Sequence, residues 1–365
     1  MTHRCSRRYS RQWVAWLMTV TVLFSAQLRA QAPEMAGPLR MSDSPLGLLV
    51  GDYVGGKVVI VDTATMAVTD SFPVYSNDPL LDINGDPALD ANGEPVFRSG
   101  KPLSVGWLNG RLYVGEERTG LIQVFERMGG KKNPKNKNSQ NKNAKDKDPR
   151  SKKPNKQAEW TMVSASLTAF PVQQPSAIVA DETRGWLFIA SKIDSVVYVL
   201  DESGTLVRTI GDANSAAPLG KPQAIALDST GSRIFVSDDG IESCTWSGCA
   251  LGSAIKVYDY DGLLLATIDG TSGNAGYKFS RAQGLALDAA GRVYLADSFR
   301  HEVMVFDEAT PNNFSALGLL GGKGAGPGQL LLPTGVLSDS ASSRILVANT
   351  MLGRIEAFAT EAQAQ

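Results

Sequence analysis

The 365-residue sequence contains only two histidines, His3 and His301, and three cysteines. One chain therefore cannot supply a histidine dyad outside the N-terminal region, or a metal site with several histidines. No CxxCH motif is present, so covalent attachment of haem c is excluded. Beyond the N-terminal region, the chain also lacks an apolar run long enough to span a membrane. With 43% hydrophobic and 20% charged residues, the composition is that of a folded globular protein.

The first 32 residues have the three parts of a secretory signal peptide. Residues 1–12 contain arginines and no acid, residues 13–26 are apolar, and alanines 26, 30 and 32 offer cleavage sites. The apolar run spans about 21 Å as a helix, less than the roughly 30 Å of a bilayer core, so a signal peptide is favoured over a membrane anchor. A twin-arginine signal at Arg7 and Arg8 is the less favoured alternative, because polar residues follow Tyr9. We therefore expect a bacterial periplasmic or extracellular protein without a transmembrane segment in its mature chain.

Export leaves two cysteines, Cys244 and Cys249, because Cys5 is removed with the signal peptide. An even pair in an oxidising compartment predicts a disulfide that closes a small loop. A redox-active dithiol is the less favoured interpretation, because such pairs are usually CxxC at a helix N-terminus. A zinc site would need two further ligands, which the neighbouring sequence does not supply.

Charge is unevenly distributed along the chain. Residues 129–157 contain eleven Lys or Arg, two Asp and no apolar residue larger than Ala, which predicts a disordered loop. Removing +9 for this segment and +5 for residues 1–32 from the total of −1 leaves −15 on the other 304 residues. The loop is interpreted either as a soluble insertion or as a means of attachment to an anionic surface, with nucleic acid an unlikely partner for an exported protein.

Six copies of one pattern fill the rest of the sequence. The plainest copies begin with PQAIALD at 222–228 and AQGLALD at 282–288, and each is followed by two further short apolar runs. Other copies begin at residues 38, 102, 175 and 333, which gives about 51 residues per copy. Short β-branched and aromatic runs between Gly, Asp and Asn predict antiparallel strands, and four strands per copy are typical of β-propeller blades. Residues 33–365 are thus expected to form one all-β domain, a six-bladed β-propeller.

This pattern resembles the NHL repeat, most closely in residues 318–358, where GGKGAGPGQ at 321–329 precedes LPTG at 332–335. The segment DSFRHEVMVF at 297–306 is also similar to the family. This resemblance implies that His301 is a turn residue rather than a ligand. The last copy lacks a fourth strand after residue 358, so the segment around residues 33–37 is expected to close the ring.

Two insertions are expected on the same rim of the disc, the one formed by the loops between second and third strands and between blades. One is the cysteine loop at 238–253, and the other, at 75–100, joins the first and second blades. The second insertion contains LDINGDP and LDANGEP, a duplicated unit whose Asn-Gly pairs predict two hairpins with type I′ turns. The Lys-rich loop leaves from the opposite rim. Insertions on a rigid scaffold make the decorated rim the candidate binding face.

Acidic residues recur in two places that a metal ion could occupy. Asp82, Asn84 and Asp86 begin like a calcium loop, but Pro87 replaces the glycine that a sharp turn needs and Gly93 replaces the bidentate acid. Acidic residues also recur at the ends of the second strands. For these, binding of backbone amides in the adjoining turns is the favoured interpretation.

Two functions follow as hypotheses. The favoured one is a non-catalytic scaffold, without a catalytic residue or cofactor, that binds a protein or polysaccharide of the cell envelope through the decorated rim. The rim residues are predicted to be Asp52, Tyr53, Glu117, Arg118, Lys192, Asp238, Trp246, Phe299, Arg300 and Met351. The alternative is a calcium-dependent lactonase or esterase-like hydrolase with a metal in the central channel. Its metal ligands are predicted to be Glu116, Asp238, Asp297 and Asn349.

Overall fold

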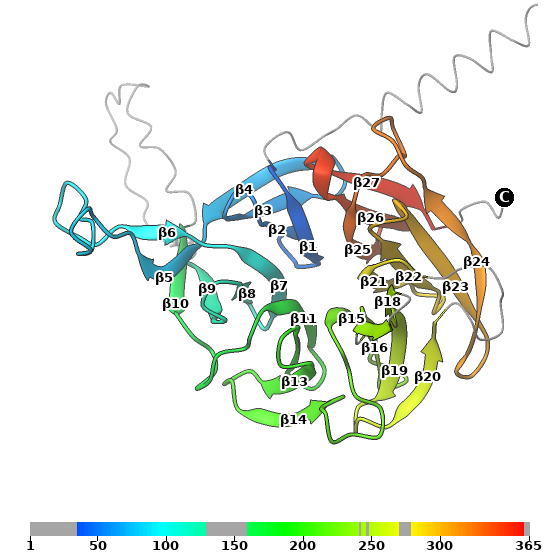
Figure 1. Cartoon of the computed structure of the whole chain (residues 1–365). Coiled ribbons are helices and arrows are strands. Elements are labelled where there is room, and N and C mark those ends of the chain that lie inside the picture. Colours follow the sequence, from blue (N-terminus) through cyan, green and yellow to red (C-terminus); the bar gives the residue numbers. More distant parts are fainter. Residues whose placement is uncertain (1–34, 129–158, 241, 246–247, 270–278, 361–365) are drawn as a thin grey trace, which may run out of the picture.

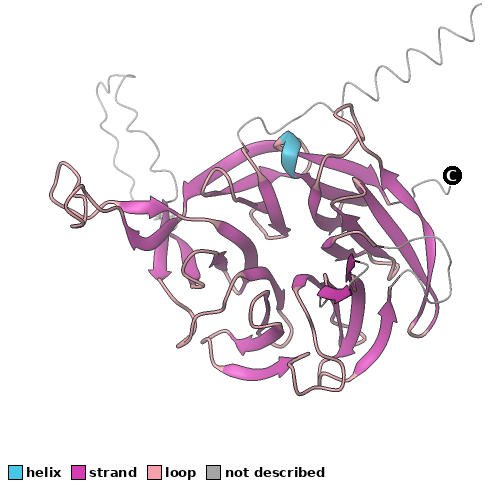
Figure 2. Cartoon of the chain, viewed as in Figure 1, coloured by secondary structure: helices cyan, strands magenta, loops and turns pink. Residues whose placement is uncertain are grey.

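Antiparallel sheets surround a central axis in the computed structural model, which describes residues 35–128, 159–240, 242–245, 248–269 and 279–360 (Figure 1). Almost all regular structure is strand, with one 3-10 turn at Thr350–Leu352 (η1) among the described residues (Figure 2). No helix in these ranges is long and apolar enough to cross a membrane. The predicted all-β propeller fold is confirmed. The proposed signal peptide and the 129–157 loop lie outside the described residues.

Six sheets make up the ring in the described part of the chain, and five of them have four strands. The first contains β1 (Pro38–Ser42), β2 (Leu48–Asp52), β3 (Lys57–Asp62) and β4 (Ala67–Pro73). The second contains β7 (Pro102–Leu108), β8 (Arg111–Glu116), β9 (Ile122–Met128) and β10 (Glu159–Ser164). The third contains β11 (Pro175–Asp181), β12 (Trp186–Ser191), β13 (Val196–Asp201) and β14 (Leu206–Ile210).

The remaining three sheets continue the same order. The fourth contains β15 (Pro222–Asp228), β16 (Arg233–Asp238), β19 (Ala254–Asp259) and β20 (Leu264–Ile268). The fifth contains β21 (Ala282–Leu287), β22 (Val293–Asp297), β23 (Glu302–Thr310) and β24 (Asn313–Gly321). The sixth has three described strands, β25 (Pro333–Asp339), β26 (Arg344–Asn349) and β27 (Arg354–Ala359). The first strand of each sheet is the innermost one. Each innermost strand neighbours that of the next sheet, and β25 in the last sheet contacts β1 in the first.

Hydrophobic packing between neighbouring sheets explains why the inner strands are apolar at nearly every position. In β2 and β8, Leu49 and Val114 belong to one buried cluster shared by the first two sheets, whereas Leu48 and Val50 face the sixth sheet. Burying such a side chain contributes about 1.5–3 kcal/mol. The outermost strands have one solvent face, and β4 accordingly alternates between exposed and less exposed residues.

Closure of the ring differs from the expectation for residues 33–37. In the described part of this segment, residues 35–37 run without strand structure and add no fourth strand to the sixth sheet. Instead, Met35 packs between the first and last sheets in a buried cluster with Leu346 and Ile355. Thr350 Oγ1 also donates to the carbonyl of Pro38 at 2.7 Å. Among the described residues, side-chain packing and this hydrogen bond join the two ends of the ring, and no strand is shared between them.

The two insertions that the structure describes leave the sheets where the sequence predicts. The segment between the first two sheets forms an arm that projects from the disc (Figure 1), with β5 (Tyr75–Pro79) paired to β6 (Phe97–Ser99). The cysteine loop contains β17 (Glu242–Thr245) and β18 (Gly248–Leu251), whose register places Cys244 opposite Cys249. No disulfide is present in the described part of the chain, so the disulfide remains a prediction.

The turns of the arm correct one prediction. Type I′ turns need positive φ at both central residues, but φ is positive at Gly85 and Gly93 and not at Asn84 or Asn92. Asp82 accepts hydrogen bonds from the backbone amides of Asn84 and Asp86 at 2.8 and 3.0 Å. The aspartate therefore organises the turn and leaves only the glycine in the left-handed region.

Candidate functional site

The acidic or amide side chains that end the second strands bind backbone amides. Asp238, fully buried, accepts hydrogen bonds from the N–H groups of Gly220, Lys221 and Gly240 and from Lys256 Nζ, over 2.6–3.1 Å. These bonds tie the segment that enters the innermost strand to the turn that follows the second strand. The same pattern recurs at Asp52, Glu116, Asp297 and Asn349. The favoured interpretation, that the acids at these strand ends bind backbone amides, is confirmed.

The four residues of the hydrolase alternative do not fit a shared calcium ion. Glu116, Asp238, Asp297 and Asn349 end strands of four different sheets, and each is occupied with amides of its own sheet. Among the described residues, no group of three or more His, Cys, Asp or Glu side chains is placed to hold a metal ion. The sequence placed these residues correctly at strand ends but wrongly brought them to one centre.

An arginine lies in the central channel instead. Each innermost strand has a register shift, a β-bulge, around its second residue. A bulge leaves backbone groups outside the ladder. Arg40 donates hydrogen bonds to three carbonyls at bulge positions, those of Ser176 at 2.9 Å, Gln223 at 2.9 Å and Thr334 at 2.5 Å. One guanidinium in β1 thereby connects three other sheets across the axis.

Space for this side chain comes from the repeat itself. Arg40 is the third residue of its innermost strand, and the equivalent residues in the other sheets are small. These residues are Ser104, Ala177, Ala224, Gly284 and Gly335. Burial lowers the pKa of Arg40 to about 10, and attraction to Asp239 opposes the shift. The guanidinium is therefore charged at neutral pH, and a second cation in the channel would be repelled.

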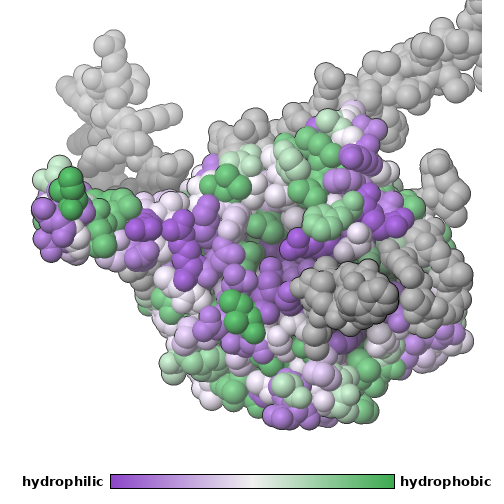
Figure 3. Space-filling model, viewed as in Figure 1, coloured by the Kyte–Doolittle hydropathy of each residue, from purple (hydrophilic) through white to green (hydrophobic). Residues whose placement is uncertain are grey.

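A polar hollow of about 590 Å³ opens at the decorated rim, next to Arg40. We call this hollow the polar mouth. Its lining residues are Gln174, Lys192, Ile193, Ser195, Gly220, Lys221, Gln223, Asp239 and Arg281. Figure 3 shows one face of the disc, where hydrophilic side chains gather around the centre and hydrophobic ones form separate patches. Three cations and one carboxylate line the mouth, so it is positive although the chain outside the Lys-rich loop is acidic.

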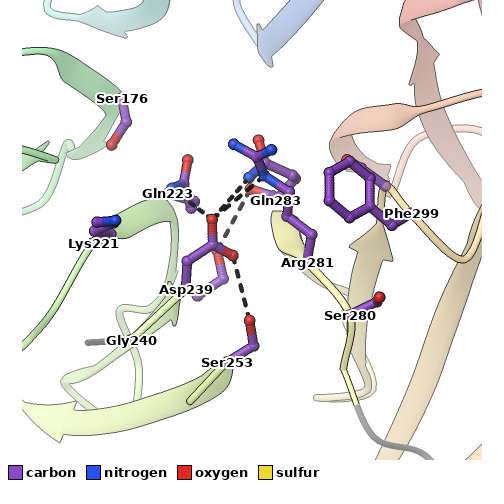
Figure 4. A network of polar contacts seen from close by, with 12 residues as sticks. Ser176, Lys221, Gln223, Asp239, Gly240, Ser253, Ser280, Arg281, Gln283 and Phe299 are labelled. Atoms are coloured by element: carbon purple, nitrogen blue, oxygen red, sulfur yellow. Dashed lines mark hydrogen bonds and ion pairs between the residues drawn. The ribbon is translucent and has the colours of Figure 1, made fainter. Parts of the chain in front are cut away.

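Asp239 organises this mouth (Figure 4). Its carboxylate accepts hydrogen bonds from Gln223 Nε2 at 3.0 Å and Gln283 Nε2 at 3.4 Å, and it lies 3.5 Å from Arg281 Nε. Burial raises the pKa of Asp239, whereas the charges of Arg281 and Lys192 lower it. Arg281 also lies over the ring of Phe299, 5.1 Å from its centre. One acid thus fixes two amides and one guanidinium around the opening.

Lys192 and Lys221 are the cations of the mouth that have no described partner. Neither ammonium group forms a hydrogen bond or ion pair with a described residue. Burial lowers the pKa of Lys192 to about 8, and repulsion by Arg40 and Arg281 adds to the shift. An anion in the mouth would relieve this repulsion and favour the charged lysine.

The lowered pKa of Lys192 predicts a pH dependence of stability. The unfolded chain keeps this lysine protonated up to about pH 10.5, so between pH 8 and 10 it binds more protons than the folded chain. The free energy of unfolding of the unmodified chain, relative to Lys192→Met, should therefore rise over this window by roughly 2 kcal/mol. Urea denaturation of both proteins at several pH values measures this difference, and a constant difference would contradict the prediction.

The predicted rim residues divide into three groups. Tyr53, Glu117, Arg118, Lys192, Phe299, Arg300 and Met351 are at least partly exposed. Asp52 and Asp238 are fully buried, which corrects their assignment to the binding surface, because backbone amides occupy their carboxylates. Trp246 lies outside the described residues. His301 has a positive φ, and its Nδ1 accepts the Leu332 N–H at 3.1 Å, which confirms its role as a turn residue.

The sequence predicted Lys192 on the rim but missed the other charged residues of the mouth and the arginine of the channel. A signal for Arg40 was present, because an arginine replaces a small residue in only one of the six aligned copies. Lys101, Lys221 and Arg281 share another signal, since each directly precedes the first residue of an innermost strand. Asp239 follows the recurrent strand-end acid by one residue, and nothing in the sequence separates its role from that of Asp238.

Comparisons with known proteins find similarity in structure alone. No model of a protein family matches the sequence, and no curated protein does either. Hydrazine synthase of Kuenenia stuttgartiensis aligns with a TM-score of 0.52 and 12% identity over 90% of this chain and 97% of that chain. A protein of unknown function from Bacteroides thetaiotaomicron aligns with a TM-score of 0.55 and 13% identity over 89% and 70%.

A streptogramin B lyase aligns with a TM-score of 0.47 and 12% identity over 88% of this chain and 92% of that chain, a similarity too low to support an argument. At such identities the similar structures inform on the fold and not on the activity. Taken with the closed ring of antiparallel sheets, they show that this chain is a β-propeller.

Proposed function

We propose that this protein is an exported, NHL-like β-propeller that binds an acidic partner, a protein or a glycan of the cell envelope, through the polar mouth and its rim. The binding is non-catalytic and needs no cofactor. The proposal also places the protein in the periplasm or outside the cell. In the same proposal, the Lys-rich loop at 129–157 holds the protein near an anionic surface from the opposite rim.

The observation that carries this proposal is the positive mouth in a domain that is acidic outside its Lys-rich loop. Lys192, Lys221 and Arg281 converge on one hollow, and only Asp239 opposes them there. The ammonium groups of both lysines lack a described partner, so they can bind an incoming carboxylate or phosphate without breaking an existing ion pair. A charged ligand that meets such a preformed site gains charge-assisted hydrogen bonds.

Exposed apolar side chains lie on the same rim as the mouth and support a macromolecular partner. Val54, Ile193, Phe299 and Met351 are 54–64% exposed, and each lies in the turn or short helix after the second strand of its sheet. Aromatic and methionine side chains around a desolvated centre are typical of recognition surfaces. The partner is therefore expected to present an acidic group for the mouth and apolar surface for the rim.

Titration calorimetry with charged and neutral probes tests the proposal. Two acidic probes, tetragalacturonate and pentaglutamate, are compared at low salt with maltotetraose and pentaglutamine. We expect at least one acidic probe to bind tenfold more tightly than its neutral counterpart, and the affinity to fall with added salt. In the double variant Lys221→Gln, Arg281→Gln this preference should be lost.

The matched control is Lys323→Gln, which removes an exposed lysine away from the residues that line the mouth. It should bind the acidic probes as the unmodified protein does. Equal binding of acidic and neutral probes, or an equal loss in the control and the double variant, would reject the mouth as an anion site.

A further inference from the structure

The other end of the central channel opens into a second hollow. Its volume is about 620 Å³, within the range of small-molecule sites. All six innermost strands contribute to its wall near their C-terminal ends, and Arg40 lies between it and the polar mouth. We call this hollow the funnel. It belongs to the face opposite to the one used in the proposed function.

One sector of the funnel carries its charge. Asp43 directly follows β1, Trp107 belongs to β7, and Glu182 directly follows β11. Strand β7 neighbours both β1 and β11, so the tryptophan lies between the two acids around the ring. No lysine or arginine is among the described residues that line the funnel.

The negative charge of this sector is not neutralised. Neither Asp43 nor Glu182 forms an ion pair with a described residue, and Asp43 accepts one backbone bond, from Ser44 at 2.9 Å. Partial desolvation by its neighbours raises the pKa of Asp43, and repulsion by Asp339 and Glu182 adds to the shift. A cation in the funnel would be attracted to both carboxylates and would offset the repulsion between them. The site therefore favours a positive ligand on grounds of both geometry and charge.

The opposite sector is apolar. Leu227, Leu287 and Leu337 come from β15, β21 and β25, and each is only partly buried in the structure. The repeat explains the contrast, because Asp43 is the only acid at its position among the six copies. The other copies have Trp107, Ala180, Leu227, Leu287 and Ser338 there. One wall of the funnel can hold a charge while the other covers apolar surface.

We propose that the funnel binds a hydrophobic ammonium ion. The cationic group lies between Asp43 and Glu182 and against the ring of Trp107, which attracts cations through its face. The apolar body packs on the leucines of the opposite wall. Aliphatic or aromatic amines of about 10–20 non-hydrogen atoms suit a hollow of this size.

Three probes that differ only in charge test this site, namely 1-naphthylmethylammonium, 1-naphthylmethanol and 1-naphthoate. Titration calorimetry on the whole mature chain should show the ammonium binding at least tenfold more tightly than the alcohol, with the carboxylate weakest. In the variant Asp43→Asn, Glu182→Gln the preference for the ammonium should fall at least fivefold, while the alcohol binds as before. Both acids are exposed, so this variant keeps the fold, and its melting temperature checks that.

Two further variants separate the funnel from the mouth and from unspecific binding. Trp107→Leu should weaken binding of the ammonium more than binding of the alcohol, because only the cation is attracted to the face of the ring. Lys221→Gln changes the polar mouth and not the funnel, so it should leave the affinities for the ammonium and the alcohol unchanged. Equal affinity for the three probes, or an ammonium preference that survives removal of both acids, would overturn the proposal. Neither result depends on whether the mouth binds an acidic partner.

Discussion

Asp238→Ala is expected to lower the free energy of unfolding by about 3–5 kcal/mol, with or without calcium. The buried carboxylate accepts hydrogen bonds from three backbone N–H groups and from Lys256 Nζ. Its removal leaves these donors without an acceptor inside the protein, and each buried unsatisfied group costs about 1–3 kcal/mol. The melting temperature should fall by roughly 5–10 °C. Thermal melting of the purified mature chain measures the change.

The calcium arms of this experiment separate the two roles considered for Asp238. An anchor of backbone amides predicts the same loss in calcium and in chelator, because no metal contributes to its bonds. A metal ligand predicts that calcium stabilises the unmodified chain and that the variant loses this stabilisation. Glu159→Ala removes an exposed carboxylate outside every candidate metal site and should melt like the unmodified chain. A calcium-dependent shift abolished by Asp238→Ala would favour the metal hypothesis over the scaffold.

Arg40→Met is expected to destabilise the protein by about 2–4 kcal/mol. The substitution removes the donors for the carbonyls of Ser176, Gln223 and Thr334, which lie in the channel. Hydrogen bonds to charged groups contribute about 1.5–3 kcal/mol each, and relief of the buried guanidinium offsets part of the loss. Urea denaturation of the variant gives the difference. Arg40→Lys retains the charge but has fewer donors in a fixed geometry. Its free energy of unfolding should therefore lie between those of Arg40→Met and the unmodified chain.

Arg118→Met is the control for Arg40, because Arg118 is exposed on the rim. Its stability should match that of the unmodified chain. If Arg40→Met proved as stable as the unmodified chain, the cost of burying the guanidinium would equal the value of its three bonds. Arg40 would then contribute charge to the polar mouth without holding the sheets together.

The repeat made most of the fold predictable. The copies beginning at residues 38, 102, 175, 222, 282 and 333 coincide with the first residues of the innermost strands β1, β7, β11, β15, β21 and β25. Residues at equivalent positions have equivalent neighbours, so one interpretation of the pattern applied to the whole chain. The strand-end acids were interpreted correctly for the same reason, since recurrence favours a role in every sheet over a role in one site.

The candidate site was less predictable because it depends on departures from the repeat. Lys192, Lys221 and Arg281 come from different sheets, and only the closed ring brings them to one hollow. The predicted rim included Lys192 and missed the other two. Asp52 and Asp238 were assigned to the binding rim because they end second strands on that rim, whereas the tight turns of this fold bury them against backbone amides.

The sequence by itself determined the all-β class, the order of strands, the places of the insertions and the turn role of His301. Each of these depends on residues close together in the chain, where spacing and side-chain type are sufficient. The tertiary structure alone decided that Arg40 fills the channel, that Asp239 organises the polar mouth, and that Asp43, Trp107 and Glu182 share one wall of the funnel. These groupings arise from closure of the ring, which sets the distances between residues far apart in sequence.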